Sequence, residues 1–278
     1  MAKKTIEWTA NEDGFWESGF GANFRDIITL TPETFFQADD VIFGNVPAAD
    51  QTVEVIGQVI PTSVTFDSTH NYTMTGGTIT GAGSVTKNGS GTATLSAADT
   101  YTGATAVNAG NLVFKAPGNV DWTLPTGTKT IANGGTMKVD FTPQSPTQFR
   151  HTHLGATVIN AGGVLDFYST TYNINSWYLI QSWTGGVSGN GSIRVSGGGA
   201  VGLWTGTANP LSTFQGVLDV QDGQFAINVD NGVTVGGPLD VSLSALGKLD
   251  MRTVISRSMP LMAWRAAKSS SRTIPRSR

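Results

Sequence analysis

The sequence predicts an all-β chain folded as a parallel β-solenoid, and three observations carry this prediction. Glycine is abundant, at 35 of 278 residues, while charged residues make up only 13% of the chain. Helical periodicity is nearly absent before residue 250, whereas short β-branched or alternating runs recur between Asn-Gly turns. Segments of the sequence also repeat, which is typical of stacked, similar units.

Composition excludes several classes of protein. The glycines follow no G-X-Y period, which excludes collagen. No run approaches 18 apolar residues, so no transmembrane helix is expected. The chain has no cysteine, which excludes disulfides, thiolate metal sites and a cysteine nucleophile. A hydrophobic content of 39% is enough for a sizeable core.

Strand and turn signals alternate along the chain. Segments 53–56, 63–66 and 94–96 alternate in polarity or are rich in β-branched residues, as strands are. Asn-Gly tolerates positive φ angles at low cost, so such dipeptides predict turns. The turn dipeptides are Asn88-Gly89, Asn133-Gly134, Asn190-Gly191 and Asn231-Gly232.

Two pairs of segments repeat. Residues 103–112 (GATAVNAGNL) match residues 155–164 (GATVINAGGV), and a longer unit at 81–112 matches a degenerate copy at 189–225. A unit of a few short strands cannot bury its apolar face alone, but stacked units can. With roughly 20–25 residues per coil and about 4.8 Å between coils, the repeats predict a rod of about 45–50 Å.

Residues 81–114 resemble the autotransporter-associated β-strand repeat, also called the passenger-associated transport repeat. Three motifs carry the resemblance: Lys87-Asn88-Gly89-Ser90-Gly91-Thr92, Thr100-Tyr101-Thr102-Gly103 and Val107-Asn108-Ala109-Gly110-Asn111-Leu112. Ala93, Ala97 and Ala106 stand where the family usually has Leu, Gly and Thr. The segment 38–68 is similar to the leader that often precedes such repeats in very large bacterial surface proteins.

The resemblance implies a right-handed parallel β-helix that is exported and displayed at the cell surface or released outside the cell. A membrane barrel or a sorting segment is expected in this family, and neither is visible in this sequence. Lys3-Lys4 is not followed by an apolar segment, so no secretory signal peptide is expected in this chain.

Composition divides the chain into three parts. Residues 1–68 are expected to form an N-terminal cap or leader, and 69–250 the solenoid repeats. Residues 251–278 carry seven basic residues, no acid and no glycine, whereas the twenty acidic and ten basic residues before them give −10. We expect this basic tail to be disordered. Its abrupt onset suggests a shifted reading frame or another origin foreign to the repeats.

Candidate catalytic and metal-binding side chains are few. Asp39 with Asp40 and Asp219 with Asp222 are the carboxylate pairs that a polysaccharide-cutting β-helix would require. Adjacent residues of a strand point to opposite faces, and Asp219 and Asp222 flank a turn, so neither pair is expected to converge. His151 and His153 could supply half of a metal site, with His70 as the only other histidine. We predict no catalytic residue, no metal and no cofactor.

Aromatic residues offer the only candidate ligand contact. Tyr172, Trp177, Tyr178 and Trp183 cluster within a dozen residues and could stack against sugar rings. Packing within the solenoid is the favoured interpretation, and Trp8 and Trp16 fit an N-terminal cap.

The sequence therefore predicts a structural passenger segment, a stalk or adhesin scaffold without enzymatic activity, at the bacterial surface or outside the cell. Surface glycans or other surface proteins are its expected partners, and nucleic acid is not. Two alternatives remain open: a glycan-binding or glycan-cleaving β-helix, and a phage tail-associated β-helix.

Overall fold

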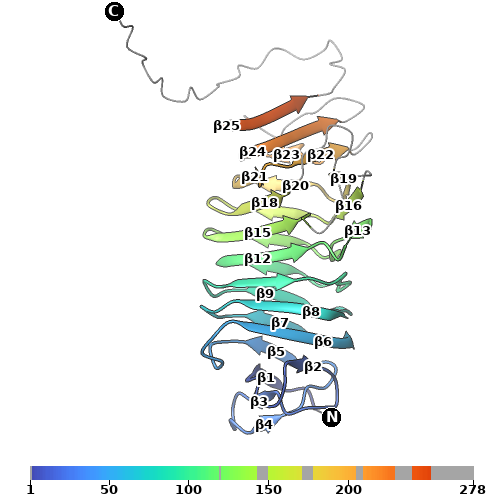
Figure 1. Cartoon of the computed structure of the whole chain (residues 1–278), viewed down its shortest axis with the longest axis vertical. Coiled ribbons are helices and arrows are strands. Elements are labelled where there is room, and N and C mark those ends of the chain that lie inside the picture. Colours follow the sequence, from blue (N-terminus) through green and yellow to red (C-terminus); the bar gives the residue numbers. More distant parts are fainter. Residues whose placement is uncertain are drawn as a thin grey trace, which may run out of the picture.

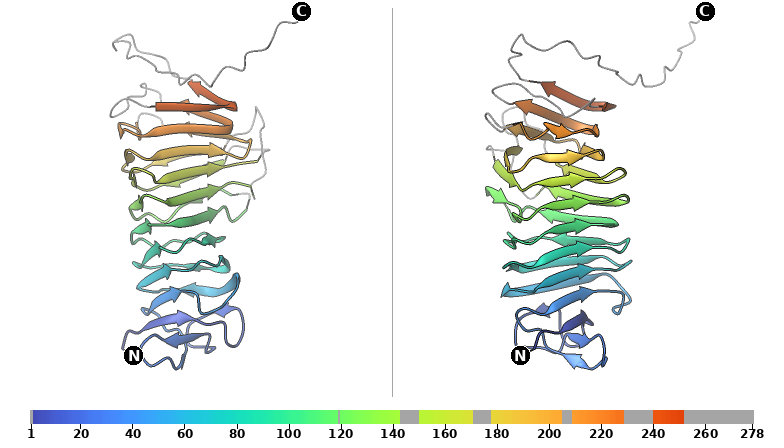
Figure 2. Two further views of the ribbon diagram at one scale, coloured as in Figure 1. Left: turned by 90° about the vertical axis from the view of Figure 1, so that its left-hand side faces the viewer. Right: turned by 180° about the vertical axis from the view of Figure 1, so that it is seen from behind.

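The computed structural model describes residues 2–118, 120–142, 150–170, 178–204, 209–228 and 240–251. Within these residues every regular element is a strand, and the strands are wound into stacked coils (Figures 1 and 2). The N-terminal strands lie at one end of the stack and β25 lies at the other. The prediction of an all-β, parallel solenoid is confirmed, while the right-handed sense of the coil stays a prediction.

The first sheet has eleven strands that follow one long face of the stack. In spatial order they are β4 (Pro32–Glu33), β3 (Phe24–Asp26), β1 (Thr5–Trp8), β5 (Asp40–Phe43), β7 (Ser63–Phe66), β9 (Ser84–Lys87), β11 (Thr105–Val107), β14 (Lys129–Ile131), β17 (Thr157–Ile159), β20 (Val187–Gly189) and β23 (Thr213–Phe214). Every pair of neighbours in this order from β1 onward, starting with β1 and β5 and ending with β20 and β23, is parallel. At the N-terminal end of the sheet, β3 pairs antiparallel with both β1 and β4.

The second sheet begins at the same end of the molecule. Its first strands are β2 (Phe15–Trp16), β6 (Gln51–Val59), β8 (Tyr72–Ile79), β10 (Thr92–Leu95), β12 (Gly110–Lys115), β15 (Gly135–Asp140), β18 (Val164–Tyr168) and β21 (Ser192–Ser196). They continue into β24 (Val217–Asn228), which also pairs with β25 (Asp240–Met251).

The long strand β24 joins a third face to the second sheet. Residues 217–220 of β24 pair with β21, whereas residues 224–228 pair with β22 (Ala200–Trp204). Beyond β22 this face continues through β19 (Tyr178–Trp183), β16 (Arg150–Leu154) and β13 (Trp122–Thr123). The coils from β13 onward therefore have three faces.

Successive coils differ in length. Equivalent positions on the first sheet are 20 residues apart between Val85 and Thr105 and 30 apart between Thr157 and Val187. Seven turns lead from β5 to β23. β5 and β7 already belong to this parallel series, so the stack begins within residues 1–68.

Parallel pairing places inward side chains on top of one another. One inward column runs along the first sheet through Val107, Ile131 and Ile159, all fully buried. A second runs along the second sheet through Leu112, Met137, Leu165, Ile193 and Leu218. The members of both columns are at most 2% exposed. Each coil buries its apolar residues only because the next coil covers them.

The register also locates the two predicted repeats. Val107 and Ile159 occupy one column, two coils apart, so the segments 103–112 and 155–164 are equivalent. The longer match is one face out of phase, because Val85 lies on the first sheet and Ile193 on the second. Short β-branched runs after a glycine turn occur on both faces, and this makes different faces look alike in sequence.

Glycines at one corner allow the coils to approach closely. A Cβ atom at Gly103 would lie 2.2 Å from the carbonyl oxygen of Gly83. A Cβ at Gly127 would lie 1.9 Å from the carbonyl oxygen of Gly103. Both contacts are far shorter than van der Waals distance and involve backbone atoms, so a larger residue requires the coils to separate.

The N-terminal end is closed by an aromatic cluster. Trp8 and Trp16 are fully buried; the Trp8 ring lies 5.1 Å from that of Phe24, and the Trp16 ring 5.5 Å from that of Phe35, both edge-on. Phe43 of the first full coil lies 5.3 Å from Trp16. The large aromatic rings cover the apolar interior where the coils begin.

We expect Gly127→Ala to lower the free energy of unfolding by more than about 2 kcal/mol, because its Cβ would collide with a backbone oxygen. Gly14→Ala is the matched control, since the nearest atom to its Cβ would lie at 3.4 Å; its effect should stay within about 0.5 kcal/mol. Urea denaturation of both variants measures the difference. Equal effects would contradict the close-approach explanation.

Candidate functional site

The repeat-like segment 81–114 contains a buried lysine. Lys87 ends β9 with its side chain inside the coil, 1% exposed, and its Nζ donates hydrogen bonds to the carbonyl oxygens of Gly89 and Ala109. Burial lowers the pKa of Lys87 to about 8. Gly110 has φ +62°, and a Cβ there would lie 2.9 Å from Nζ. The lysine therefore joins the turns of two successive coils, and a glycine leaves room for it.

Two further polar contacts lie in the middle of the repeat-like segment. Asp99 is 4% exposed, and its Oδ1 accepts a 2.7 Å hydrogen bond from the backbone N–H of Ile79 in the coil below. Burial raises the pKa of Asp99 to about 7. The hydroxyls of Tyr101 and Thr105 are 2.8 Å apart, and burial raises the pKa of Tyr101. These side chains hold the corner between two coils.

A second buried lysine, Lys129, lies at the start of its strand, whereas Lys87 lies at the end of its own. Lys129 begins β14 and is fully buried, and its Nζ donates to the carbonyl oxygens of Pro125 and Gly127. Burial lowers the pKa of Lys129 to about 8. Above it, Thr157 accepts a 3.2 Å hydrogen bond from Trp183 Nε1. The interior therefore contains polar groups that bind backbone carbonyls and each other.

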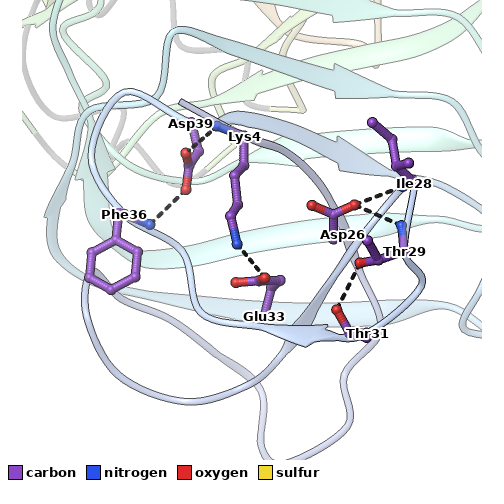
Figure 3. A network of polar contacts seen from close by, with 8 residues as sticks. All are labelled: Lys4, Asp26, Ile28, Thr29, Thr31, Glu33, Phe36 and Asp39. Atoms are coloured by element: carbon purple, nitrogen blue, oxygen red, sulfur yellow. Dashed lines mark hydrogen bonds and ion pairs between the residues drawn. The ribbon is translucent and has the colours of Figure 1, made fainter. Parts of the chain in front are cut away.

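The adjacent carboxylates Asp39 and Asp40 have separate partners. Asp39 accepts hydrogen bonds from the backbone N–H groups of Lys4 and Phe36, at 2.8 and 2.9 Å (Figure 3). Asp40 forms a 2.8 Å ion pair with Lys3 and accepts a 2.7 Å hydrogen bond from Ser63. Both carboxylates tie the N-terminal strand to the coils.

The neighbouring polar contacts close the same end of the molecule. Figure 3 shows Lys4 reaching Glu33 of β4, with which it forms an ion pair. Asp26 accepts hydrogen bonds from the backbone N–H groups of Thr29 and Ile28, and these bonds lower its pKa. The network fixes the antiparallel hairpin that covers the first coil.

The other candidate carboxylates also have local roles. Asp219 accepts hydrogen bonds from Arg194 Nε at 3.4 Å and from Gln221 at 2.9 Å. Asp222 lies at the bend of β24, and its carbonyl oxygen accepts a hydrogen bond from the N–H of Gly198. Asp219 therefore lies opposite a cation, and Asp222 lies at a turn.

Alternating charges run across the outer face of the second sheet. Lys138, Asp166, Arg194 and Asp219 stand in register on four successive strands. Lys138 Nζ lies 4.0 Å from Asp166 and 4.1 Å from the ring centroid of Tyr168. We call these four residues the charge ladder. Its signs alternate at spacings of one coil, but the amino-acid sequence does not reveal the pattern, because the coil length cannot be read from it.

Asp166 is the most enclosed member of the charge ladder. It is 4% exposed, and Ser196 Oγ donates a 2.8 Å hydrogen bond to its Oδ1. Burial raises the pKa of Asp166, while Ser196, Lys138 and Arg194 act in the opposite direction. Opposite charges on neighbouring strands stabilise the sheet, whereas like charges there would repel.

The remaining predicted site residues lie apart or outside the described residues. Trp183 is 5% exposed, with its ring 6.0 Å from and edge-on to Phe167; a buried indole cannot stack on a sugar. Tyr172 and Trp177 lie outside the described residues, and only the backbone of Tyr178 is described. The glycan prediction stays untested for these three.

Two of the three histidines lie on β16. The side chain of His151 is not described, and His153 is half-buried on β16. No group of three or more His, Cys, Asp or Glu side chains in the described part of the chain is placed to hold a metal ion. Nor does that part contain a helix with the length and apolarity that a membrane crossing requires.

The fold and its interior polar contacts define a β-solenoid repeat protein. The family model of the passenger-associated-transport-repeat matches residues 85–114, the segment that contains Lys87, Asp99 and Tyr101. The predicted resemblance is therefore confirmed for this segment. No curated protein and no solved structure matches the chain.

We expect stability to depend on pH through Asp99. Its pKa is about 7 in the folded state against an ordinary 3.8, so the folded protein retains a proton that the unfolded chain loses in this range. Stability therefore falls as pH rises from about 4 to about 7, by up to about 4 kcal/mol. Asp99→Asn keeps an acceptor for Ile79 and should remove this slope in urea denaturation. A variant with the wild-type slope would contradict the assignment.

We expect Ser196→Ala to lower the free energy of unfolding by about 1–3 kcal/mol, because it removes the hydrogen bond to the buried Asp166 carboxylate. Ser192 lies on the same face of β21, and Ser192→Ala is the control, with an expected effect within about 0.5 kcal/mol. Thermal or urea unfolding measures both. A Ser196→Ala variant as stable as the control would show that the bond contributes nothing.

Proposed function

We propose that the chain is a structural segment of a bacterial surface or secreted protein of the autotransporter type, serving as a stiff stalk or display scaffold without catalysis. The observation that carries the proposal is the matched repeat at 85–114, whose distinctive polar residues bind the backbone of adjacent coils. These side chains stabilise the stack instead of facing a ligand.

The uninterrupted parallel pairing supports a mechanical role. Nine strands from β1 to β23 pair in parallel on the first sheet, which spans roughly 38 Å at about 4.8 Å between strands. Bending such a rod requires breaking backbone hydrogen bonds and opening the apolar columns. A coil-by-coil stack also suits folding during export, since each coil presents a template for the next.

The candidate carboxylates support the absence of catalysis. Acid–base hydrolysis of a glycan requires two carboxyl groups that converge on one bond. Asp39, Asp40 and Asp219 each bind separate backbone or side-chain partners, and Asp39 is buried. These contacts hold strands of the fold together.

The test places the full chain between a signal peptide and the membrane translocator of an autotransporter. We expect the chain to appear at the cell surface in a folded form, protected from added protease except at exposed segments. The Gly127→Ala variant should reach the surface less efficiently or in a protease-sensitive form, and Gly14→Ala should behave as the wild type. A chain that folds yet stays inside the cell would contradict the surface role.

A further inference from the structure

The Asn-Gly turns of this chain are chemically labile as well as structural. An asparagine followed by glycine is prone to spontaneous deamidation, because glycine has no side chain to shield its backbone nitrogen. The structure describes three of these dipeptides, Asn88-Gly89, Asn133-Gly134 and Asn190-Gly191, while Asn231-Gly232 lies outside the described residues. The same two residues occur in three different surroundings, so the fold decides which of them reacts.

Deamidation begins when the backbone nitrogen of the glycine attacks Cγ, the side-chain carbonyl carbon of the asparagine. The backbone amide gives its proton to hydroxide, the new N–Cγ bond closes a five-membered succinimide, and the side-chain nitrogen takes a proton from water and leaves as ammonia. Water then opens the ring. Cleavage of the N–Cγ bond gives aspartate, and cleavage of the other ring C–N bond gives isoaspartate, whose main chain runs through Cγ. The asparagine side chain must therefore be free to rotate, and hydroxide must reach the glycine nitrogen.

The Asn133-Gly134 turn between β14 and β15 meets both requirements. A 3.0 Å hydrogen bond from the N–H of Gly135 to the carbonyl oxygen of Ala132 closes the turn. Asn133 and Gly134 are both exposed, and no atom lies within 4 Å of the position that a Cβ at Gly134 would occupy. The N–H of Gly134 donates a 3.2 Å hydrogen bond to the carbonyl oxygen of Gly162 in the next coil, at the long end of the usual range. This one bond has to open before the attack.

Asn88-Gly89 is fixed by its neighbours. The Asn88 Oδ1 accepts a 2.8 Å hydrogen bond from Nδ2 of Asn108 in the next coil, which holds the side-chain amide in place. A Cβ at Gly89 would lie 2.2 Å from the carbonyl oxygen of Ser68, so the glycine backbone is packed against the coil below. The carbonyl oxygen of Gly89 also accepts a hydrogen bond from the buried Lys87. Attack on Asn88 Cγ therefore requires the coils to separate.

Asn190-Gly191 is protected on the glycine side alone. Asn190 is exposed, but Gly191 is buried. The N–H of Gly191 donates a 2.9 Å hydrogen bond to the carbonyl oxygen of Ile159, and a Cβ at Gly191 would lie 2.4 Å from the carbonyl oxygen of Asn160. Hydroxide cannot reach this nitrogen while the coils stay together.

We propose that Asn133 is the site at which the folded chain deamidates, and that the stacking of the coils protects Asn88 and Asn190 from the same reaction. The product carries a new negative charge at one corner of the stack. Isoaspartate also adds one atom to the main chain of the turn. A Cβ at Gly135, the next residue, would lie 2.4 Å from the carbonyl oxygen of Val107, so this turn has little room for a longer backbone.

Peptide mapping by mass spectrometry of the folded full chain, incubated in mildly alkaline buffer, tests the assignment. We expect Asn133 to convert at least about tenfold faster than Asn88 or Asn190, because these two react only after local separation of coils, and tenfold corresponds to an opening free energy of only about 1.4 kcal/mol. The mapping resolves Asn231 as a separate peptide, so its conversion does not enter the comparison.

The same chain unfolded in urea is the control for intrinsic reactivity. There the three asparagines should convert at rates within about twofold of one another, because each precedes a glycine and the coils are gone. Asn133→Gln should remove most of the deamidation mapped to the described Asn-Gly dipeptides of the folded chain.

A matched pair of proteins tests the effect on the stack. The isoaspartate form of residue 133, separated by chromatography, should unfold at a lower urea concentration than the Asn133→Asp variant. Both proteins carry the new charge, and only the isoaspartate form has the longer main chain. Equal urea midpoints would show that the turn accommodates the extra atom and would overturn this part of the proposal.

Two results would overturn the site assignment. Equal conversion of Asn88, Asn133 and Asn190 in the folded chain would mean that coil stacking gives no protection. An Asn133 that keeps its amide in the folded chain but loses it in urea would mean that the hydrogen bond to Gly162 is enough to hold the Gly134 nitrogen.

Discussion

Parallel backbone pairing between successive coils is the constraint on which the rest of this structure depends. It places each inward residue on the inward residue of the coil below, so that Met137, Leu165 and Ile193 form one buried column. A slip of one residue in any strand would turn that strand's apolar side chains outward. Variation in coil length, from 20 to 30 residues on the first sheet, is therefore absorbed mainly between the strands, and β6, β19 and β25 each take up one extra residue at a bulge.

The close spacing of the coils explains the polar residues of the matched repeat. Turns that approach one another bring carbonyl groups into a region with little water, where an unpaired polar group is costly. Lys87 and Lys129 supply donors to these carbonyls, and Asp99 accepts from an N–H of the coil below. Burial favours the neutral form of all three side chains: it lowers the pKa of both lysines and raises the pKa of Asp99. The same residues therefore make stability sensitive to pH.

Different interactions stabilise the sides and the N-terminal end of the stack. On the sides, most strands have neighbours on both edges, and alternating charges such as Asp166 and Arg194 can face each other without repulsion. At the N-terminal end, a short antiparallel hairpin and buried tryptophans replace the missing coil. At β25, Leu243 pairs with the buried Val220 yet is 47% exposed, so the two described ends of the stack differ.

The amino-acid sequence alone was enough to predict the fold class, the repeat at 81–114, which the family match confirms at 85–114, and the equivalence of 103–112 with 155–164, because glycine turns and β-branched runs report local backbone preference. It also indicated that adjacent Asp39 and Asp40 would not converge. Tertiary structure alone decided the phase of 189–225, the interior positions of Lys87 and Lys129, and the charge ladder. These features depend on which residues lie one coil apart. Coil length varies with loops that carry no periodic signal, so only the register of the folded chain reveals them.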